Sequence, residues 1–385
     1  MSDYKRELRK LQLKKRNGLK ISESYDRLCS DPSKVDDLLE LSWLNLKGRS
    51  QHIRDCGSYL EFGLLSGGGA VLQHANFCRE RLCPACTYRR SLKAFANISR
   101  CLDWVDENDS DHKFLFLTLT VRNVKGPDLA DCLSMMAAGW NRFCANKAIK
   151  SRVKGSIRTC EVTINEKDGT YHPHYHIILA VSGEYNSWAK QYLTTVEWAR
   201  KWQKSCRLDY LPSTSISLIR GKAGGIKETA KYSVKDNDIL SAPVDEEIDK
   251  RVYYLTKGLY GKRMLAFLGC FKAAKKALAI KDECEDDLTD TVLRKDVVQA
   301  VVVCRWNVGA YVYDTERIEL DYEEWRTEDR EVADQIDDGA SKEATDHGKS
   351  GRGEHGGLYR GLHQCAVVPS SENKRIVSDY YCNRV

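Results

Sequence analysis

The sequence has no apolar run as long as a membrane span, and its first twenty residues form a charged helical pattern without a signal-peptide core. These absences argue against a membrane-spanning or secreted protein and predict a cytoplasmic one. Its 15 cysteines should then stay reduced, so clustered cysteines are better interpreted as metal ligands than as disulfides. No internal repeat is visible. The 385 residues suit two or three ordinary domains with a substantial core.

Charge is unevenly distributed along the chain. Residues 282–385 contain 13 lysines and arginines against 24 acids, a net charge of −11. Because the whole chain has a net charge of +6, residues 1–281 carry a net charge of +17. A basic body with an acidic C-terminal region suggests a polyanionic partner, most simply nucleic acid. A solvated surface of mixed charge is the alternative that charge alone leaves open.

The segment YHPHYHIIL, residues 171–179, places His172, His174 and His176 at alternate positions of an apolar run. In a β-strand such residues project from one face. The preceding run 157–165, IRTCEVTIN, also has the pattern of a strand. The two runs therefore predict a β-hairpin.

The connection contains Asp168-Gly169, which is typical of a two-residue hairpin turn. Pairing that is symmetric about this turn would put Glu161 opposite His176 and Thr163 opposite His174. Directly opposed residues share a face of the sheet. Glu161, His174 and His176 are therefore candidate ligands of a divalent metal with open coordination positions. The alternatives are ordinary strand histidines and the two-histidine, one-carboxylate iron site of oxygenases.

Four cysteines lie close together in the sequence as C-x21-C-x4-C-x2-C: Cys56, Cys78, Cys83 and Cys86. The C-x-x-C turn followed by the basic TYRRSLK is typical of a structural zinc site. Four thiolates would close the tetrahedron and leave no position for catalysis. His74 could replace one of the first two ligands, and free buried or redox-active thiols are the other interpretation.

The order of expected elements predicts the fold class. A strand at 114–120, a helix from 129, the histidine hairpin, a helix at 187–206 and a strand near 214–219 give strand, helix, strand, strand, helix, strand, followed by one more helix. This is an α+β fold with a ferredoxin-like central antiparallel sheet, in which helices cover one face and the other is free for a site. Segments 297–304 and 310–320 suggest a terminal hairpin.

The segment KETAKYSVKD, residues 227–236, contains Glu228, Lys231, Tyr232 and Lys235. In a continuous helix, Glu228, Tyr232 and Lys235 would share one face. A tyrosine beside lysines and a carboxylate suits phosphoryl chemistry, since the lysines steady anionic oxygens and the carboxylate takes a proton. An exposed helix with a packed tyrosine is the commoner explanation of such a segment taken alone.

Together, FLFLTLT, HPHYHIIL and ETAKYSVK resemble, in order and spacing, the three motifs of HUH-type rolling-circle replication initiators. The chain most resembles the plasmid Rep family with a cysteine cluster before the first motif. That family also has an R-x5-G-x-F-K segment after the third motif, here Arg263, Gly269, Phe271 and Lys272. The resemblance covers about residues 50–280. It leaves out the N-terminal helix and the acidic tail.

The resemblance implies a HUH endonuclease core and roles for particular residues. His174 and His176 would be the HUH pair, with Glu161 as third ligand of Mg²⁺ or Mn²⁺. Tyr232 would be the nicking tyrosine, in a single-tyrosine enzyme. Glu228 would activate water at termination, and Lys235 would assist the chemistry. DNA contacts are expected from three basic residues: Lys231, Arg89 and Arg90.

The predicted function is a metal-dependent, sequence- and strand-specific nick at a plasmid origin through a 5′-phosphotyrosine, followed by strand transfer or rejoining. The substrate would be origin DNA, single-stranded or extruded as a hairpin. A host helicase and DNA polymerase are implied by the resemblance. A relaxase, a single-tyrosine transposase and a non-catalytic zinc-containing DNA-binding protein are the alternatives.

Five segments are expected. Residues 1–50 form a charged helical segment, 51–105 a small zinc-binding module and 106–281 the HUH endonuclease domain. Residues 282–327 form an acidic segment with the hairpin, and 328–385 a mostly disordered tail.

Overall fold

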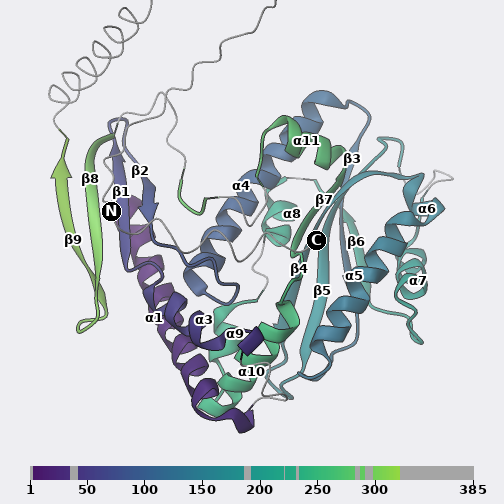
Figure 1. Cartoon of the computed structure of the whole chain (residues 1–385). Coiled ribbons are helices and arrows are strands. Elements are labelled where there is room, and N and C mark those ends of the chain that lie inside the picture. Colours follow the sequence, from purple (N-terminus) through teal and green to yellow (C-terminus); the bar gives the residue numbers. More distant parts are fainter. Residues whose placement is uncertain are drawn as a thin grey trace, which may run out of the picture. The chain divides into compact units, whose positions relative to one another are not determined.

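The computed structural model describes residues 3–34, 42–185, 192–220, 222–230, 234–281, 287–290 and 298–320. Residues up to Glu319 belong to one unit of the chain, drawn in Figure 1. The tail expected at 328–385 lies outside the described residues, and the five segment boundaries remain predictions. None of the helices in the described ranges combines the length and apolar character needed to cross a membrane.

A five-stranded antiparallel sheet carries the histidine motif. Its strand order is β6-β3-β5-β4-β7, so strands far apart in the sequence become neighbours. The strands are β3 (Lys113–Thr120), β4 (Val153–Ile164), β5 (Tyr171–Val181), β6 (Thr214–Leu218) and β7 (Leu265–Gly269). Between β3 and β4 lie α5 (Leu129–Ala145) and the short α6 (Lys147–Lys150), and α7 (Thr195–Cys206) lies between β5 and β6. The predicted order of strands and helices is confirmed.

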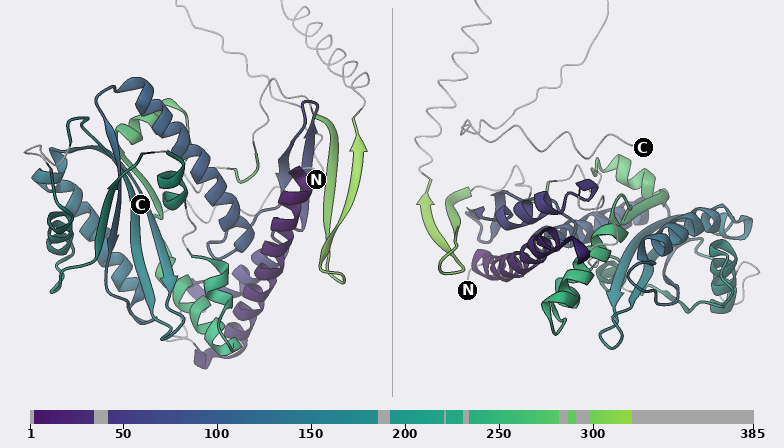
Figure 2. Two further views of the ribbon diagram at one scale, coloured as in Figure 1. Left: turned by 180° about the vertical axis from the view of Figure 1, so that it is seen from behind. Right: turned by 60° about the horizontal axis from the view of Figure 1, so that its bottom comes forward.

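Helices cover both faces of this sheet, as Figures 1 and 2 show. Residues such as Leu117, Val162 and Ile177 face a core built with α5, α7 and α10 (Asp245–Leu259). Ile157 and Ile178 face the opposite core, built with α4 (Pro84–Asn108), α8 (Lys222–Thr229) and α11 (Cys270–Ala277). The expectation that one face stays free of helices is therefore wrong.

The histidine hairpin forms with a register different from the predicted one. Glu161 pairs with His174 and Thr163 with His172, a shift of two residues along the ladder. The cause is a longer turn: the Gly169 N–H donates to the Asn165 carbonyl at 2.8 Å, and Gly169 takes a φ of +68° as the last residue of the loop. Because side chains alternate with period two, a shift of two keeps every residue on its predicted face.

The helix expected at 187–206 begins at Thr195, while residues 186–191 lie outside the described part of the chain. Its start is fixed by a capping box in which Thr194 and Glu197 exchange side-chain to backbone hydrogen bonds. Trp198 and Trp202 fill the core, whereas Val196 is exposed.

A second antiparallel sheet has the order β2-β1-β8-β9. Its strands are β1 (Tyr59–Leu65), β2 (Ala70–Ala75), β8 (Val298–Asn307) and β9 (Val312–Glu319). The predicted terminal hairpin is thus present, and it pairs with β1, more than 230 positions earlier in the chain. Helices α1 (Asp3–Ser30), η1 (Pro32–Lys34), α3 (Leu46–Asp55) and α9 (Asp236–Leu240) complete the described elements.

Candidate active site and metal centres

Glu161, His174 and His176 come together on one face of the five-stranded sheet. Glu161 lies on β4 and the two histidines on β5, and all three are buried, with 3 to 8% of their surface exposed. Glu161 Oε2 is 3.2 Å from His174 Nε2 and 2.9 Å from His176 Nε2, and the two Nε2 atoms are 3.1 Å apart. The corrected register puts Glu161 directly opposite His174 and diagonal to His176.

The protonation of His174 makes this cluster a candidate metal site. Its Nδ1 lies 3.0 Å from the His172 carbonyl oxygen, which can only accept a hydrogen bond, so Nδ1 carries a proton. In a neutral ring Nε2 then presents its lone pair to the cluster. A nitrogen lone pair and a carboxylate oxygen repel each other at this distance. A cation bound between them would remove the repulsion.

The spacing of the three atoms fits such a cation. In an octahedral site with bonds of about 2.1 Å, neighbouring ligand atoms are about 3.0 Å apart. The observed separations of 2.9, 3.1 and 3.2 Å match one face of that octahedron. Three protein ligands would leave the opposite positions for water or substrate oxygens. The residues therefore fit a divalent metal.

Lys235 adds a positive charge beside the cluster, with its Nζ 3.3 Å from Glu161 Oε1. That oxygen is buried and accepts no hydrogen bond from the described residues. Burial alone would raise the pKa of Glu161, but its close contacts with the His174 and His176 imidazoles and the charge of Lys235 hold it well below its usual range. Glu161 is therefore a carboxylate at neutral pH and suited to bind a cation.

The segment around the candidate nucleophile is not the continuous helix that the sequence predicts. Helix α8 ends at Thr229, and α9 begins at Asp236 after an extended Lys235 with φ −84° and ψ 133°. Glu228 is half-buried on α8. Lys231 and Tyr232 lie outside the described residues. Glu228 therefore lies on α8, whereas Lys235 is the extended residue before α9, and the shared helical face predicted for them is wrong.

The four cysteines of the C-x21-C-x4-C-x2-C pattern form the second cluster. Cys56 Sγ lies 3.5 Å from Cys86 Sγ and 3.4 Å from Cys83 Sγ, and Cys78 Sγ lies 3.7 Å from Cys86 Sγ. A tetrahedral zinc with bonds of about 2.3 Å places its sulfurs about 3.8 Å apart. The cluster therefore fits a closed structural zinc site.

Backbone donors surround these sulfurs. The N–H of Cys78 donates to Cys56 Sγ at 3.4 Å, and the N–H of Arg79 donates to Cys86 Sγ at 3.1 Å. Such donors stabilise thiolates. His74 does not join the cluster, because it lies exposed on β2 with its Nε2 3.8 Å from Glu61 Oε1. The four-cysteine alternative is the one that the geometry supports.

Arg89 does not occupy a DNA-binding surface, and this prediction is corrected. It is 2% exposed, and its guanidinium donates to the Leu288 carbonyl at 2.7 Å and to Asp290 Oδ1 at 2.6 Å. A further hydrogen bond reaches Glu7 Oε1 at 3.2 Å. Burial among these acceptors leaves no guanidinium edge for a phosphate. The neighbouring Arg90 is half-buried and donates to the Glu80 carbonyl.

Two contacts near the candidate site could not be found in the sequence. Lys14 Nζ lies 2.6 Å from Asp236 Oδ1, and Asn17 Nδ2 donates to Asp236 Oδ2 at 2.6 Å. These contacts join α1 to the residue that follows Lys235. No local pattern marks Lys14 among the many charged residues of α1, so only the folded chain reveals this contact.

The family model and the relatives found by comparison with known proteins are all described as "Replication protein" or "Protein rep". A family model described as "Replication protein" matches residues 69–314. "Protein rep" of Streptococcus pneumoniae serotype 2 is 34% identical over 270 residues, which are 68% of this chain and 83% of that protein. "Protein rep" of Lentilactobacillus hilgardii is 34% identical over 281 residues, 70% of this chain and 88% of its own.

A "Replication protein" of Staphylococcus aureus is 36% identical over 205 residues, which are 51% of this chain and 87% of that protein. No solved structure matches significantly.

Proposed function

The chain belongs to the Rep family of plasmid rolling-circle replication initiators, and we propose that it nicks one strand of its plasmid origin with Tyr232 as the nucleophile. The observation that carries this proposal is the buried cluster of Glu161, His174 and His176, whose spacing fits a divalent metal. The cluster lies beside Lys235, three positions after the tyrosine of the third motif.

The sheet supports the assignment of a HUH core. Strands β3, β4, β5 and β6 and helices α5 and α7 follow each other as strand, helix, strand, strand, helix, strand, and the strands are arranged as β6-β3-β5-β4. This is the split βαβ topology of ferredoxin-like domains. It brings the two histidines to the central strand, between the strands that carry Glu161 and the first motif.

The proposed reaction is a transesterification. A phenol with a pKa of about 10 is only about one part in a thousand ionised at pH 7. A divalent metal held by Glu161, His174 and His176 would polarise the scissile phosphate. The Tyr232 oxygen attacks phosphorus, the bond to the 3′ oxygen breaks, and that oxygen takes up a proton. The products are a 5′-phosphotyrosine and a free 3′-hydroxyl, and the ester keeps the bond available for rejoining.

Lys235 and Glu228 have separate roles in this proposal. The Lys235 ammonium neutralises charge on the phosphate or the phenolate, as its 3.3 Å approach to Glu161 supports. Glu228 serves as the base for water when the covalent intermediate is hydrolysed at termination. The four cysteines hold a structural zinc that stabilises the N-terminal part of the chain.

The proposed substrate is origin DNA, single-stranded or extruded as a hairpin, since a base-paired strand could not place its phosphate against a buried cluster. A host DNA polymerase would extend the free 3′ end, and a host helicase would be the second partner. A relaxase or a transposase would share the chemistry and differ in the DNA that is cut.

Mass spectrometry tests the proposal. The full chain is incubated with Mg²⁺ or Mn²⁺ and a single strand of the plasmid origin, and the adduct is mapped by proteolysis. We expect one oligonucleotide on Tyr232 and no adduct in Tyr232→Phe, while Tyr210→Phe serves as the control and keeps the adduct. Absence of any adduct in the wild type would favour a non-catalytic DNA-binding protein. An adduct that persists in Tyr232→Phe would assign another nucleophile.

A further inference from the structure

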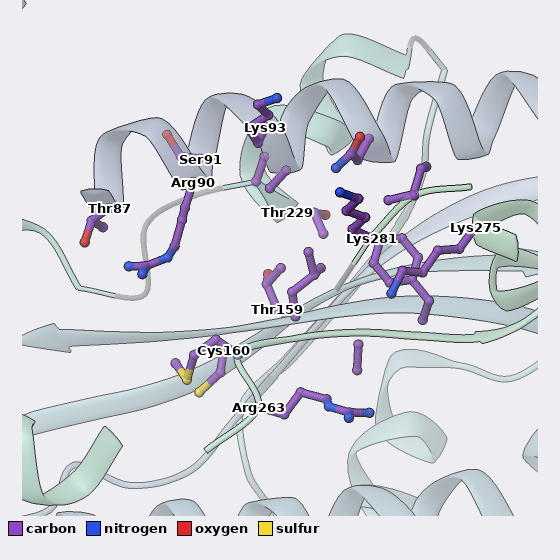
Figure 3. A pocket seen from close by; sticks show the side chains of 18 of the residues that line it. Thr87, Arg90, Ser91, Lys93, Thr159, Cys160, Thr229, Arg263, Lys275 and Lys281 are labelled. Carbon is purple, nitrogen blue, oxygen red and sulfur yellow. The ribbon is translucent and has the colours of Figure 1, made fainter. Parts of the chain in front are cut away.

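A basic pocket of about 360 Å³ lies on the face of the sheet that carries the metal cluster, between α4, β4, β7 and α11 (Figure 3). Among the described residues, no carboxylate lines the pocket. Seven cationic residues do: Arg81, Arg90, Lys93, Arg263, Lys272, Lys275 and Lys281. In Figure 3 Arg90 extends from α4 toward the strands, and Lys275 and Lys281 come from the other end of the pocket. Such a lining attracts a polyanion.

The inner wall of the pocket is apolar and includes one aromatic ring. Leu265 and Phe267 of β7 belong to this wall, together with Ala94 of α4. Phe267 is half-buried, and Lys275 Nζ lies 5.8 Å from the centre of its ring. A cationic rim around an aromatic surface is the combination by which proteins bind single-stranded nucleic acid, since every base can stack on a ring. An inorganic anion would not use the apolar wall.

The pocket adjoins the metal cluster. Thr159 lines it and lies directly opposite His176 in the β4–β5 ladder, on the same face of β4 as Glu161 two positions later. Thr229 and Ala230 also line it, and they precede Lys231 and Tyr232 in the sequence. A residue spacing along a strand is about 3.3 Å. Thr159 and Glu161, which are two positions apart, are therefore separated by about 6.6 Å along β4. This separation between the pocket and the cluster suits one nucleotide step.

We infer that this basic pocket holds the nucleotide next to the scissile phosphate, with its base against Phe267 and its backbone phosphate between the lysines of α11. The inference rests on the proposed function for the position of the scissile phosphate. It assigns origin recognition partly to a pocket whose cationic residues come from α4, α11 and nearby segments and lie outside the three motifs. The volume agrees, because small-ligand pockets begin at about 300 Å³.

The first experiment tests whether the α11 lysines hold a phosphate. It measures, by fluorescence anisotropy and without added divalent metal, the binding of a fluorescein-labelled single strand that spans the nick site. The double variant Lys272→Gln/Lys275→Gln should bind about tenfold more weakly at low salt. The slope of log K against log salt should fall by about 0.7 for each phosphate that the variant no longer neutralises. Lys276→Gln is the matched control, since Lys276 is exposed on the same helix and does not line the pocket. Binding that is weakened equally in Lys272→Gln/Lys275→Gln and in Lys276→Gln would overturn the inference.

A second arm tests the stacking of the base and its position. Single abasic sites are moved along the strand, and each is compared in wild type, Phe267→Ala and the volume-conserving Phe267→Leu. We expect the abasic site beside the nick to weaken wild-type binding at least fivefold and to have no further effect in Phe267→Ala. Persistence of that effect in Phe267→Ala would overturn the pocket assignment. Adduct formation is scored separately, so a failed pocket and a failed nicking proposal give different results.

Discussion

Lys235 Nζ lies 3.3 Å from Oε1 of Glu161, so the segment that follows Tyr232 is joined to the histidine cluster by an ion pair. The ammonium is 42% exposed, whereas the carboxylate is almost fully buried. An exposed ammonium beside a buried carboxylate can turn toward an incoming phosphate without leaving the site. In the proposed reaction it would therefore act on the substrate as well as on the protein.

Lys235→Met should lower the rate of covalent adduct formation about tenfold or more, because the phosphate or phenolate loses a nearby positive charge. Metal affinity, measured by titration with Mn²⁺, should not fall, since a cation that competes for Glu161 has been removed. Lys227→Met, at an exposed position of α8, is the control and should keep wild-type rates. A Lys235→Met protein that nicks normally would limit this lysine to an ion pair.

Glu161→Gln should weaken Mn²⁺ binding by at least about tenfold, because a neutral amide replaces a carboxylate ligand. His174→Ala and His176→Ala should each abolish cleavage, with partial rescue by excess Mn²⁺. Calorimetric titration gives the affinities, and Glu166→Gln in the exposed hairpin loop is the control. Unchanged affinity in Glu161→Gln would remove this carboxylate from the metal site.

Cys83→Ser and Cys86→Ser should release zinc and lower the free energy of unfolding by several kcal/mol, since a closed thiolate site contributes folding energy. Elemental analysis should find one zinc in the wild type and none in the variants. A chelator should lower the Tm of the wild type in the same way. Cys29→Ser, outside the cluster, should keep its zinc. A zinc-free wild-type protein with an unchanged Tm would contradict the site.

Glu228→Ala should preserve the initial nick and impair termination, because attack by Tyr232 does not need a base for water whereas hydrolysis does. The covalent Tyr232 adduct and multimeric displaced strands should accumulate in a replication assay. Glu228→Gln should behave like the alanine variant, since it keeps the size of the side chain and loses its basicity. Equal loss of nicking and hydrolysis would make Glu228 a helper of the tyrosine itself.

Arg89→Met should lower the free energy of unfolding by about 2 kcal/mol or more, because it removes the buried partner of Glu7, Asp290 and the Leu288 carbonyl. Chemical denaturation measures the change. The exposed Arg100 on the same helix provides the control, and Arg100→Met should shift stability by less than about 0.5 kcal/mol. A stable Arg89→Met protein with weakened DNA binding would restore the role predicted from the sequence.

The sequence alone determined which face of the sheet carries the candidate metal ligands. Alternation with period two puts His174, His176 and Glu161 on one side in any register of even shift, so the two-residue error in pairing did not move them. The spacing of the four cysteines in the sequence likewise predicted their cluster, because a C-x-x-C turn brings two thiolates together locally.

Contacts between distant segments were decided only by the tertiary structure. Three features illustrate this: the break between α8 and α9, the pairing of β8 with β1, and the ion pair of Lys14 with Asp236. Each depends on packing between segments more than 60 residues apart in the sequence or on competition between local and tertiary interactions. Arg89 and Arg90 look alike in the sequence, yet one is buried and the other lines the basic pocket. Local periodicity fixes the direction of a side chain within its element, but what that side chain meets depends on where the fold places the other elements.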